Sequence, residues 1–65
     1  MTIDYGTLIK TRRTELGITQ KELAERVGCH RTLIMQAEKD ANHLKFGTFQ
    51  KIIYELYLNI EITEA

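Results

Sequence analysis

The sequence has 65 residues, enough for one domain with a modest core, and its nine Lys and Arg are balanced by nine Asp and Glu. A single cysteine and the lack of Cys/His pairs at zinc spacing exclude a disulfide-stapled or zinc-stapled fold. Since no apolar stretch approaches the ~20 residues of a membrane span and no apolar N-terminal run is present, we expect one domain over residues 1–65 in a reducing cytoplasm, with no membrane, metal or cofactor.

The charges are separated along the chain. All nine basic residues lie between Lys10 and Lys51 with only five acidic ones, so this stretch carries a net charge of +4. The acidic residues at positions 4, 55, 61 and 64 place a charge of −4 near the two ends. This separation lets one face meet phosphates while another has a different role. The neutral total predicts weaker nonspecific affinity for nucleic acid than a strongly basic domain has.

The first helix is predicted from about Asp4 to Leu16. Gly17 has the usual position of a helix-ending glycine, and Ile18 begins the next contact. The residues expected on the inner side of this helix are Leu8, Ile9, Arg12 or Arg13, and Leu16.

Two short amphipathic helical patterns follow and meet at Gly28. Thr19 and Glu22 have the spacing of a capping box, which predicts the start of the second helix. Gly28 can adopt the left-handed conformation that a tight turn needs, and the third helix is predicted to begin near His30, a weaker cap than Ser or Thr. The apolar residues that a helix-turn-helix motif must bury are Leu23, Val27, Cys29, Ile34 and Ala37, with small Ala24 at the crossing. We therefore predict this motif over about residues 19–39. Its second helix, which is the third helix of the chain, has the position that enters a DNA major groove.

A polar connector over residues 40–45 leads to a fourth helix, and then the period of the pattern changes. The fourth helix has an inward apolar face of Phe46, Phe49, Ile52, Ile53 and Leu56. Over about residues 57–63, apolar and polar residues alternate as in a half-buried strand. A lone strand lacks a backbone partner, so we expect it to pair with the same strand of a second copy in a two-fold dimer. A frayed tail or one further helical turn is the alternative.

A combined signature runs through most of the chain: Ile9, Arg13, Gly17, Thr19-Gln20, Leu23-Ala24, Val27-Gly28, Ile34, Glu38, Phe46-x-Thr48-Phe49 and Lys51-Ile52. Over about residues 8–62 the chain resembles the Cro/phage-repressor type of helix-turn-helix, the Xre superfamily. The resemblance implies a small all-α, lambda-repressor-like domain of four to five helices.

Within that superfamily, the Phe-x-Thr-Phe helix running into residues 56–62 resembles the HipB-type antitoxin branch, in which the C-terminal strand pairs across the dimer. Three positions depart from the common pattern. Asp40 replaces a frequent glycine, and Leu33 and Met35 stand where small polar residues are frequent. The connector can therefore take a different path, and no relative supplies the base preference.

The DNA-contacting residues are expected at the start of the third helix and one turn further along. Arg31 can bond a guanine edge and Gln36 an adenine edge, each through two hydrogen bonds, and Met35 can pack on a thymine methyl group. The full set of predicted base contacts is His30, Arg31, Thr32, Met35 and Gln36. By resemblance, Gln20 holds a phosphate at the positive end of the second helix. The full set of predicted phosphate contacts is Thr19, Gln20, Lys21, Lys39, Asn42, His43 and Lys45.

Other predicted roles are structural. The resemblance implies an ion pair between Arg13 and Glu38 that links the first helix to the end of the third. Cys29 is expected to be a packing residue and not a nucleophile, because no base stands beside it. The predicted dimer-interface residues are Phe49, Ile53, Leu56, Leu58, Ile60 and Ile62.

Simpler roles remain open for several of these residues. Arg31 can be a solvated charge, Met35 a packed side chain, His30 only a poor cap and His43 an ordinary loop residue. Lys21 can instead pair with Glu25 along the helix.

The leading hypothesis is a dimeric repressor that binds double-stranded DNA at a palindromic operator. Its finer form is the autoregulating antitoxin of a toxin–antitoxin pair, with a kinase-like toxin as a further partner. A phage or mobile-element Cro-like regulator is one alternative. A protein-interaction module that keeps the fold without binding DNA is another. An enzyme is not expected, since no phosphate loop, metal cluster or nucleophile–base pair is visible.

Overall fold

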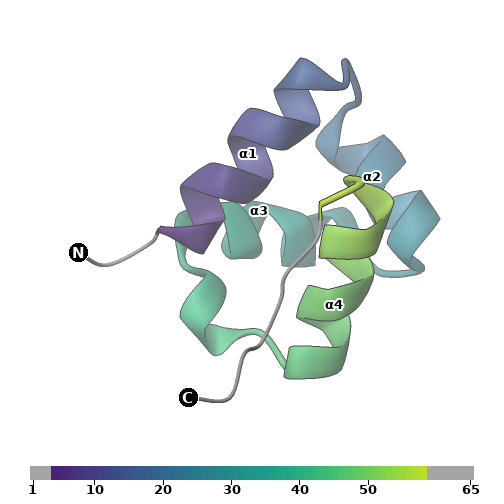
Figure 1. The fold of residues 1–65 in the computed structure, drawn as a ribbon. Coiled ribbons are helices and arrows are strands. Elements are labelled where there is room, and N and C mark those ends of the chain that lie inside the picture. Colours follow the sequence, from purple (N-terminus) through teal and green to yellow (C-terminus); the bar gives the residue numbers. More distant parts are fainter. Residues whose placement is uncertain (1–3, 59–65) are drawn as a thin grey trace.

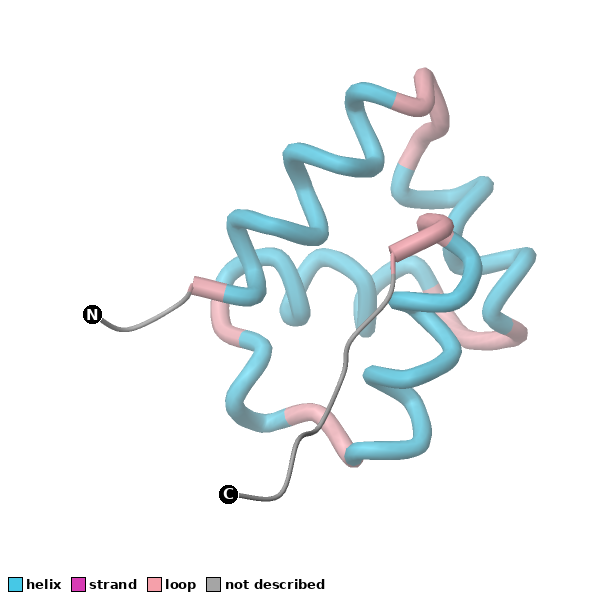
Figure 2. Tube along the Cα trace, viewed as in Figure 1, coloured by secondary structure: helices cyan, strands magenta, loops and turns pink. Residues whose placement is uncertain are grey.

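The computed structural model describes residues 4–58, and all regular elements in that range are helices (Figure 1). The elements are α1 (Tyr5–Glu15), α2 (Gln20–Val27), α3 (Arg31–Lys39), the 3-10 helix η1 (Ala41–His43) and α4 (Phe46–Glu55). Figure 2 shows the same path as helices joined by short loops, with no strand among the described residues. The predicted all-α helix-turn-helix fold is confirmed.

Helix α3 lies at the centre of the fold. Helices α1 and α2 both pack against it, and α4 packs against α2 (Figure 1). The core is formed by the buried residues Ile9, Ile18, Leu23, Ala24, Ile34, Ala37, Ile52, Ile53 and Leu56. Each of the α-helices α1 to α4 thus contributes at least one fully buried aliphatic side chain, as expected for amphipathic helices around one core.

The first helix begins and ends as predicted. The Asp4 carboxylate caps it by accepting hydrogen bonds from the backbone amide of Thr7 at 3.1 Å and from the Thr7 hydroxyl at 2.8 Å. At the other end Gly17 has a φ of +71°, and the amides of Gly17 and Ile18 bond back to the carbonyls of Thr14 and Arg13. This is the Schellman arrangement, in which glycine takes the left-handed position without a steric cost.

Gly6 permits the close crossing of α1 and α3, a role that the pattern analysis missed. A Cβ atom built on Gly6 would lie 2.5 Å from the backbone carbonyl oxygen of Glu38 and 2.9 Å from that of Ala37. Any larger residue therefore forces the two helices apart. No local signal in the sequence marks this glycine, because the contact involves residues far along the chain.

Two predicted inner positions prove to be exposed. The side chain of Leu8 in α1 is 36 % exposed, and that of Phe46 in the first turn of α4 is 58 % exposed. The other residues of the α4 stripe, Phe49, Ile52, Ile53 and Leu56, lie in the core or pack against it. Phe46 instead lines a surface hollow of about 190 Å³ with Tyr5, Ala41, Leu44 and Phe49.

The end of α4 differs from the sequence prediction. Tyr57 adopts a left-handed φ of +57°, and the amides of Tyr57 and Leu58 bond back to the carbonyls of Tyr54 and Ile53. These two residues complete a second Schellman arrangement and are not the start of a strand, so the prediction is wrong for residues 57–58. The rest of the expected strand, residues 59–63, lies outside the described residues.

Candidate nucleic-acid interface

The turn between α2 and α3 sets the orientation of α3, the second helix of the motif. Gly28 has a φ of +84°, and the amides of Gly28 and Cys29 both bond to the Ala24 carbonyl, at 2.8 and 3.0 Å. Cys29 packs half-buried against the core, and burial raises the pKa of its thiol. A raised thiol pKa disfavours the reactive thiolate, which fits a packing role for Cys29.

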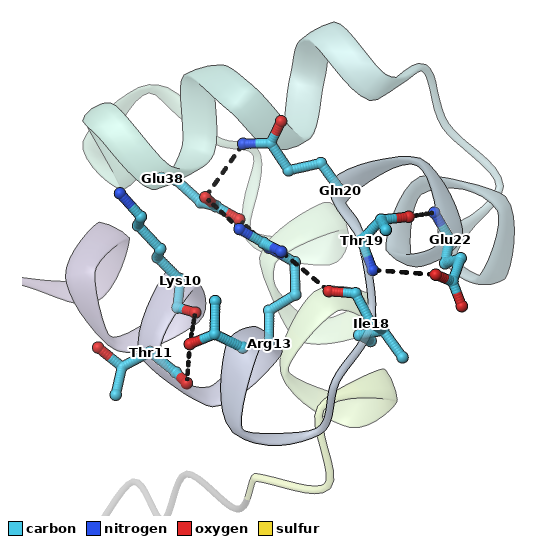
Figure 3. A network of polar contacts seen from close by, with 9 residues as sticks. Lys10, Thr11, Arg13, Ile18, Thr19, Gln20, Glu22 and Glu38 are labelled. Carbon is cyan, nitrogen blue, oxygen red and sulfur yellow. Dashed lines mark hydrogen bonds and ion pairs between the residues drawn. The ribbon is translucent and has the colours of Figure 1, made fainter.

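The start of α2 is capped by the side chains of Thr19 and Glu22. The Thr19 hydroxyl accepts from the Glu22 amide at 3.0 Å, and the Glu22 carboxylate accepts from the Thr19 amide at 3.2 Å. This is the predicted capping box, drawn in Figure 3. The backbone amides of Gln20 and Lys21 have no hydrogen-bond partner within residues 4–58, so they are available to an anion.

Gln20 and Lys21, which carry these free amides, line a basic surface hollow of about 600 Å³. Its cationic side chains are Arg13 from α1, Lys21 from α2 and Arg31 from α3. The remaining lining residues are Thr14, Gly17, Ile18, Thr19 and Gln20, so no acidic side chain lines it. The fold thus brings three predicted phosphate contacts, Thr19, Gln20 and Lys21, into one hollow with the predicted base contact Arg31.

Helix α3 presents a polar face to solvent. His30 is the N-cap residue but makes no side-chain capping bond. The predicted base contacts His30, Arg31, Thr32, Met35 and Gln36 are all exposed. On the opposite side Ile34 and Ala37 are buried in the core, and Leu33 is half-buried. The face of α3 that was predicted to contact bases is therefore accessible to solvent.

A polar network holds α3 against the rest of the domain (Figure 3). Arg13 Nε lies 2.7 Å from Glu38 Oε2, and these two side chains are only 12 % and 5 % exposed. Arg13 also donates through Nη1 to the Ile18 carbonyl at 2.9 Å and through Nη2 to Glu38 Oε1 at 3.3 Å. The ion pair that the resemblance implied is present, and it joins α1 to the last turn of α3.

Sequence reasoning missed one member of this network. Gln20 Nε2 donates to Glu38 Oε1 at 3.1 Å, which ties the first residue of α2 to the same carboxylate. The two residues are far apart in the sequence, and neither position carries a local signal for the contact.

The connector after α3 combines predicted phosphate contacts with an acidic residue. Lys39, Asn42, His43 and Lys45 are all exposed. The Asp40 carboxylate accepts from the Asn42 amide at 3.0 Å, and its second oxygen lies 3.1 Å from His43 Nε2. Asp40 therefore starts η1, and its charge reduces the positive potential of this loop.

The predicted dimer-interface residues divide into two groups. Ile53 and Leu56 are 5 % and 0 % exposed within the single chain, so they form its own core and cannot offer surface to a second copy. This corrects the prediction for those two residues. Phe49 and Leu58 are half-buried, while Ile60 and Ile62 lie outside the described residues.

A contact that the pattern did not suggest fixes the end of α4: Arg12 Nε donates to the Leu56 carbonyl at 3.0 Å.

Within positions 4–58, no group of three or more His, Cys, Asp and Glu side chains is placed to hold a metal ion. None of the helices in this part of the chain has the length and apolar character needed to cross a membrane.

This geometry, a capped helix joined by a left-handed glycine turn to an exposed second helix, defines a helix-turn-helix protein. The helix-turn-helix family model HTH_3 matches residues 9–63, and the chain belongs to this family.

One curated relative is a transcriptional regulator. The chain is 61 % identical over 33 residues to an uncharacterised HTH-type transcriptional regulator of Methanothermobacter thermautotrophicus, a match that spans 51 % of this chain and 48 % of that protein. The matched segment is thus about half the length of that curated relative.

Solved structures share the whole fold. HipB in a HipB-O1-O2 complex superimposes with a TM-score of 0.83 at 26 % identity, over 98 % of this chain and 96 % of HipB. A Y37A mutant of the restriction-modification controller protein C.Esp1396I gives a TM-score of 0.80 at 28 % identity, over 86 % of this chain and 73 % of that protein. These similarities confirm the resemblance to the Xre superfamily and to its HipB branch.

Proposed function

We propose that this protein is a sequence-specific DNA-binding transcriptional regulator. The observation that carries the proposal is the basic hollow at the start of α2, which adjoins Arg31 on the exposed face of α3. Phosphate contacts position a protein on DNA, and base contacts specify the sequence. The nearness of these residues within one motif supports assigning both tasks to it.

Each group has a defined part in this proposal. The free amides of Gln20 and Lys21 receive a backbone phosphate at the positive end of α2, with the Lys21 ammonium beside them. Arg31 donates two hydrogen bonds to guanine, and Gln36 pairs with adenine one turn further along. Thr32 and Met35 lie on the same accessible face, where they contact neighbouring base pairs. Lys39, Asn42, His43 and Lys45 contact the phosphates beyond this helix.

We further propose that the active form is a two-fold dimer that represses from a palindromic operator. Half-site centres are then separated by about one helical turn, ~34 Å. Phe49, Leu58, Ile60 and Ile62 are the interface residues of this proposal, with the alternating segment up to residue 63 paired across the two-fold axis. A neutral chain gains little from nonspecific attraction, so two linked recognition helices supply the needed affinity.

The antitoxin role is the finer form of the proposal. A chain of the HipA-HipB-O2-O3 complex superimposes on 98 % of this chain with a TM-score of 0.83. By analogy, this protein pairs with a kinase-like toxin and represses their shared operon. A toxin gene beside its own gene supports this role, whereas a neighbouring integrase or a restriction-modification operon supports a phage or controller-type regulator.

The experiment that tests DNA binding is selection of bound duplexes from a random pool at about 0.15 M salt, where nonspecific binding is reduced. We expect a two-fold symmetric site. Arg31→Glu should abolish the enrichment while the circular dichroism spectrum and the melting temperature stay unchanged. Arg26→Glu is the matched control, because Arg26 is also an exposed arginine but lies at the opposite end of α2, outside the basic hollow. If no site is enriched by folded native protein, the alternative of a protein-interaction module without DNA binding is favoured.

A further inference from the structure

The side-chain amide of Gln20 is held in one orientation. Its Nε2 lies 3.1 Å from Glu38 Oε1, in a partly buried contact between α2 and α3 (Figure 3). Only the NH2 end of an amide can face a carboxylate, because two oxygens repel each other. One Nε2 hydrogen is therefore used by Glu38, and the second hydrogen and the carbonyl oxygen remain available.

The carboxylate that holds this amide is itself fixed. Glu38 accepts from Arg13 through both of its oxygens and from Gln20 through Oε1, and its side chain is only 5 % exposed. Hydrogen bonds to an ionised acceptor are about twice as strong as those between neutral groups. One buried carboxylate thus connects three helices, and its position depends on the Arg13 guanidinium.

Gln20 also borders the surface that is proposed to receive DNA. It lines the basic hollow together with Lys21 and Arg31, and it is the first residue of α2. We infer that Glu38 is a positioning residue for DNA contact by Gln20, an inference that rests on the proposed function. Glu38 holds the amide so that its second Nε2 hydrogen is ready to donate to a phosphate beside the free backbone amides of Gln20 and Lys21. The Arg13–Glu38 pair therefore prepares the phosphate site in addition to supporting the fold.

The first test uses the native protein without DNA. The side-chain amide resonances of its three glutamines, Gln20, Gln36 and Gln50, are compared by 15N NMR. Gln36 and Gln50 are exposed and serve as internal controls. We expect the two Gln20 protons to be more widely separated in chemical shift and to exchange more slowly with water. Gln20 resonances that match the two controls would overturn the inference, whatever the DNA result.

The second test is a double-mutant cycle with the most enriched 30-base-pair duplex from the random-pool selection as the probe. Arg13→Met/Glu38→Leu removes both partners of the ion pair, so that no buried charge is left alone. We expect Gln20→Met to weaken binding about fivefold in the native background, the effect of one lost hydrogen bond, and less than about twofold in the double variant.

The outcomes of this cycle are distinguishable. An equal loss in both backgrounds shows that Gln20 acts without Glu38 and overturns the inference. If the native protein enriches no duplex from the random pool, the proposed function fails, and an orientation role in DNA contact fails with it, even if the NMR signature is present. The NMR test needs no variant, so it remains decisive if Arg13→Met/Glu38→Leu does not fold.

Discussion

Helices α2 and α3 form one motif, yet their first turns are built in opposite ways. At the start of α2, Thr19 and Glu22 cap each other's backbone, and Gln20 is tied to α3. At the start of α3, His30 makes no capping bond and the next two residues, Arg31 and Thr32, are exposed. The start of α2 thus has a side-chain cap, although the amides of Gln20 and Lys21 stay free, whereas the start of α3 has no side-chain cap.

This difference separates stability from recognition. A capping box contributes to folding whether or not DNA is present, because its hydrogen bonds lie within the chain. The uncapped start of α3 gives up such a contribution and keeps its amides and side chains accessible. The comparison therefore predicts that substitutions at the two starts affect different measurements.

The largest effect is expected at the residue that connects the two helices. Glu38→Ala leaves the Arg13 guanidinium without its carboxylate and the Gln20 amide without its acceptor, and we expect a loss of ~3–5 kcal/mol in the free energy of unfolding. Urea unfolding followed by circular dichroism measures it. Lys39→Ala, the exposed neighbouring residue, is the control and should change stability by less than ~0.5 kcal/mol. Similar losses for both variants would contradict a specific role for the network.

The next effect concerns the cap of α2. Thr19→Ala removes the hydroxyl that accepts from the Glu22 amide, and we expect a loss of ~1 kcal/mol in the free energy of unfolding. Thr11→Ala makes the same chemical change in the exposed interior of α1 and should have little effect. If the two threonine variants melt at the same temperature, the capping box is not a stabilising element.

A gain in stability is expected at the start of α3. His30→Ser supplies the missing capping oxygen and should raise the free energy of unfolding by ~0.5–1 kcal/mol. His30→Asp should stabilise similarly but weaken DNA binding, since a carboxylate at this position repels phosphates. Thermal unfolding and duplex titration of both variants separate the two effects. A stabilised His30→Asp variant that binds DNA as well as native protein would place the first turn of α3 outside the interface.

The smallest effect concerns the cap of α1 and depends on pH. Hydrogen bonds from the Thr7 hydroxyl and, next, from the Thr7 amide hold the pKa of the Asp4 carboxyl below its usual value. A lowered pKa stabilises the folded state at pH values above the unfolded-state pKa, and this contribution is lost as the pH falls through the folded-state pKa. Acidification from about pH 5 to about pH 3 should therefore lower the melting temperature of native protein more than that of Asp4→Asn. Parallel pH profiles of the native protein and Asp4→Asn would contradict a stabilising role for the ionised cap.

The local elements of this fold could be predicted because their signals are local. Thr19 with Glu22, Gly17 and Gly28 each act within a few residues of the chain, and the structure shows them as the expected caps. The weak cap at His30 was predicted for the same reason. The exposed face of α3 followed from helical periodicity, since burial of Ile34 and Ala37 turns Arg31 and Gln36 outward.

The errors occurred where a residue's surroundings depend on distant segments. Periodicity gave α4 an apolar stripe but could not say which part of it would meet the chain's own core. Packing buries Ile53 and Leu56 within the single chain and leaves Phe46 exposed. Alternation likewise extended the expected strand back to Tyr57, where the structure has the end of a helix.

The sequence by itself determined the limits of α1 and α2, the start of α3, the turn that joins α2 to α3, and the residue types offered to DNA. These features depend on hydrogen bonds and backbone conformations within one or two helical turns. The tertiary structure alone decided that Gly6 meets the end of α3, that Arg12 holds the end of α4, and that Glu38 gathers Arg13 and Gln20. Such contacts require the packed arrangement of whole helices, because the residues that make them meet only after the core has closed.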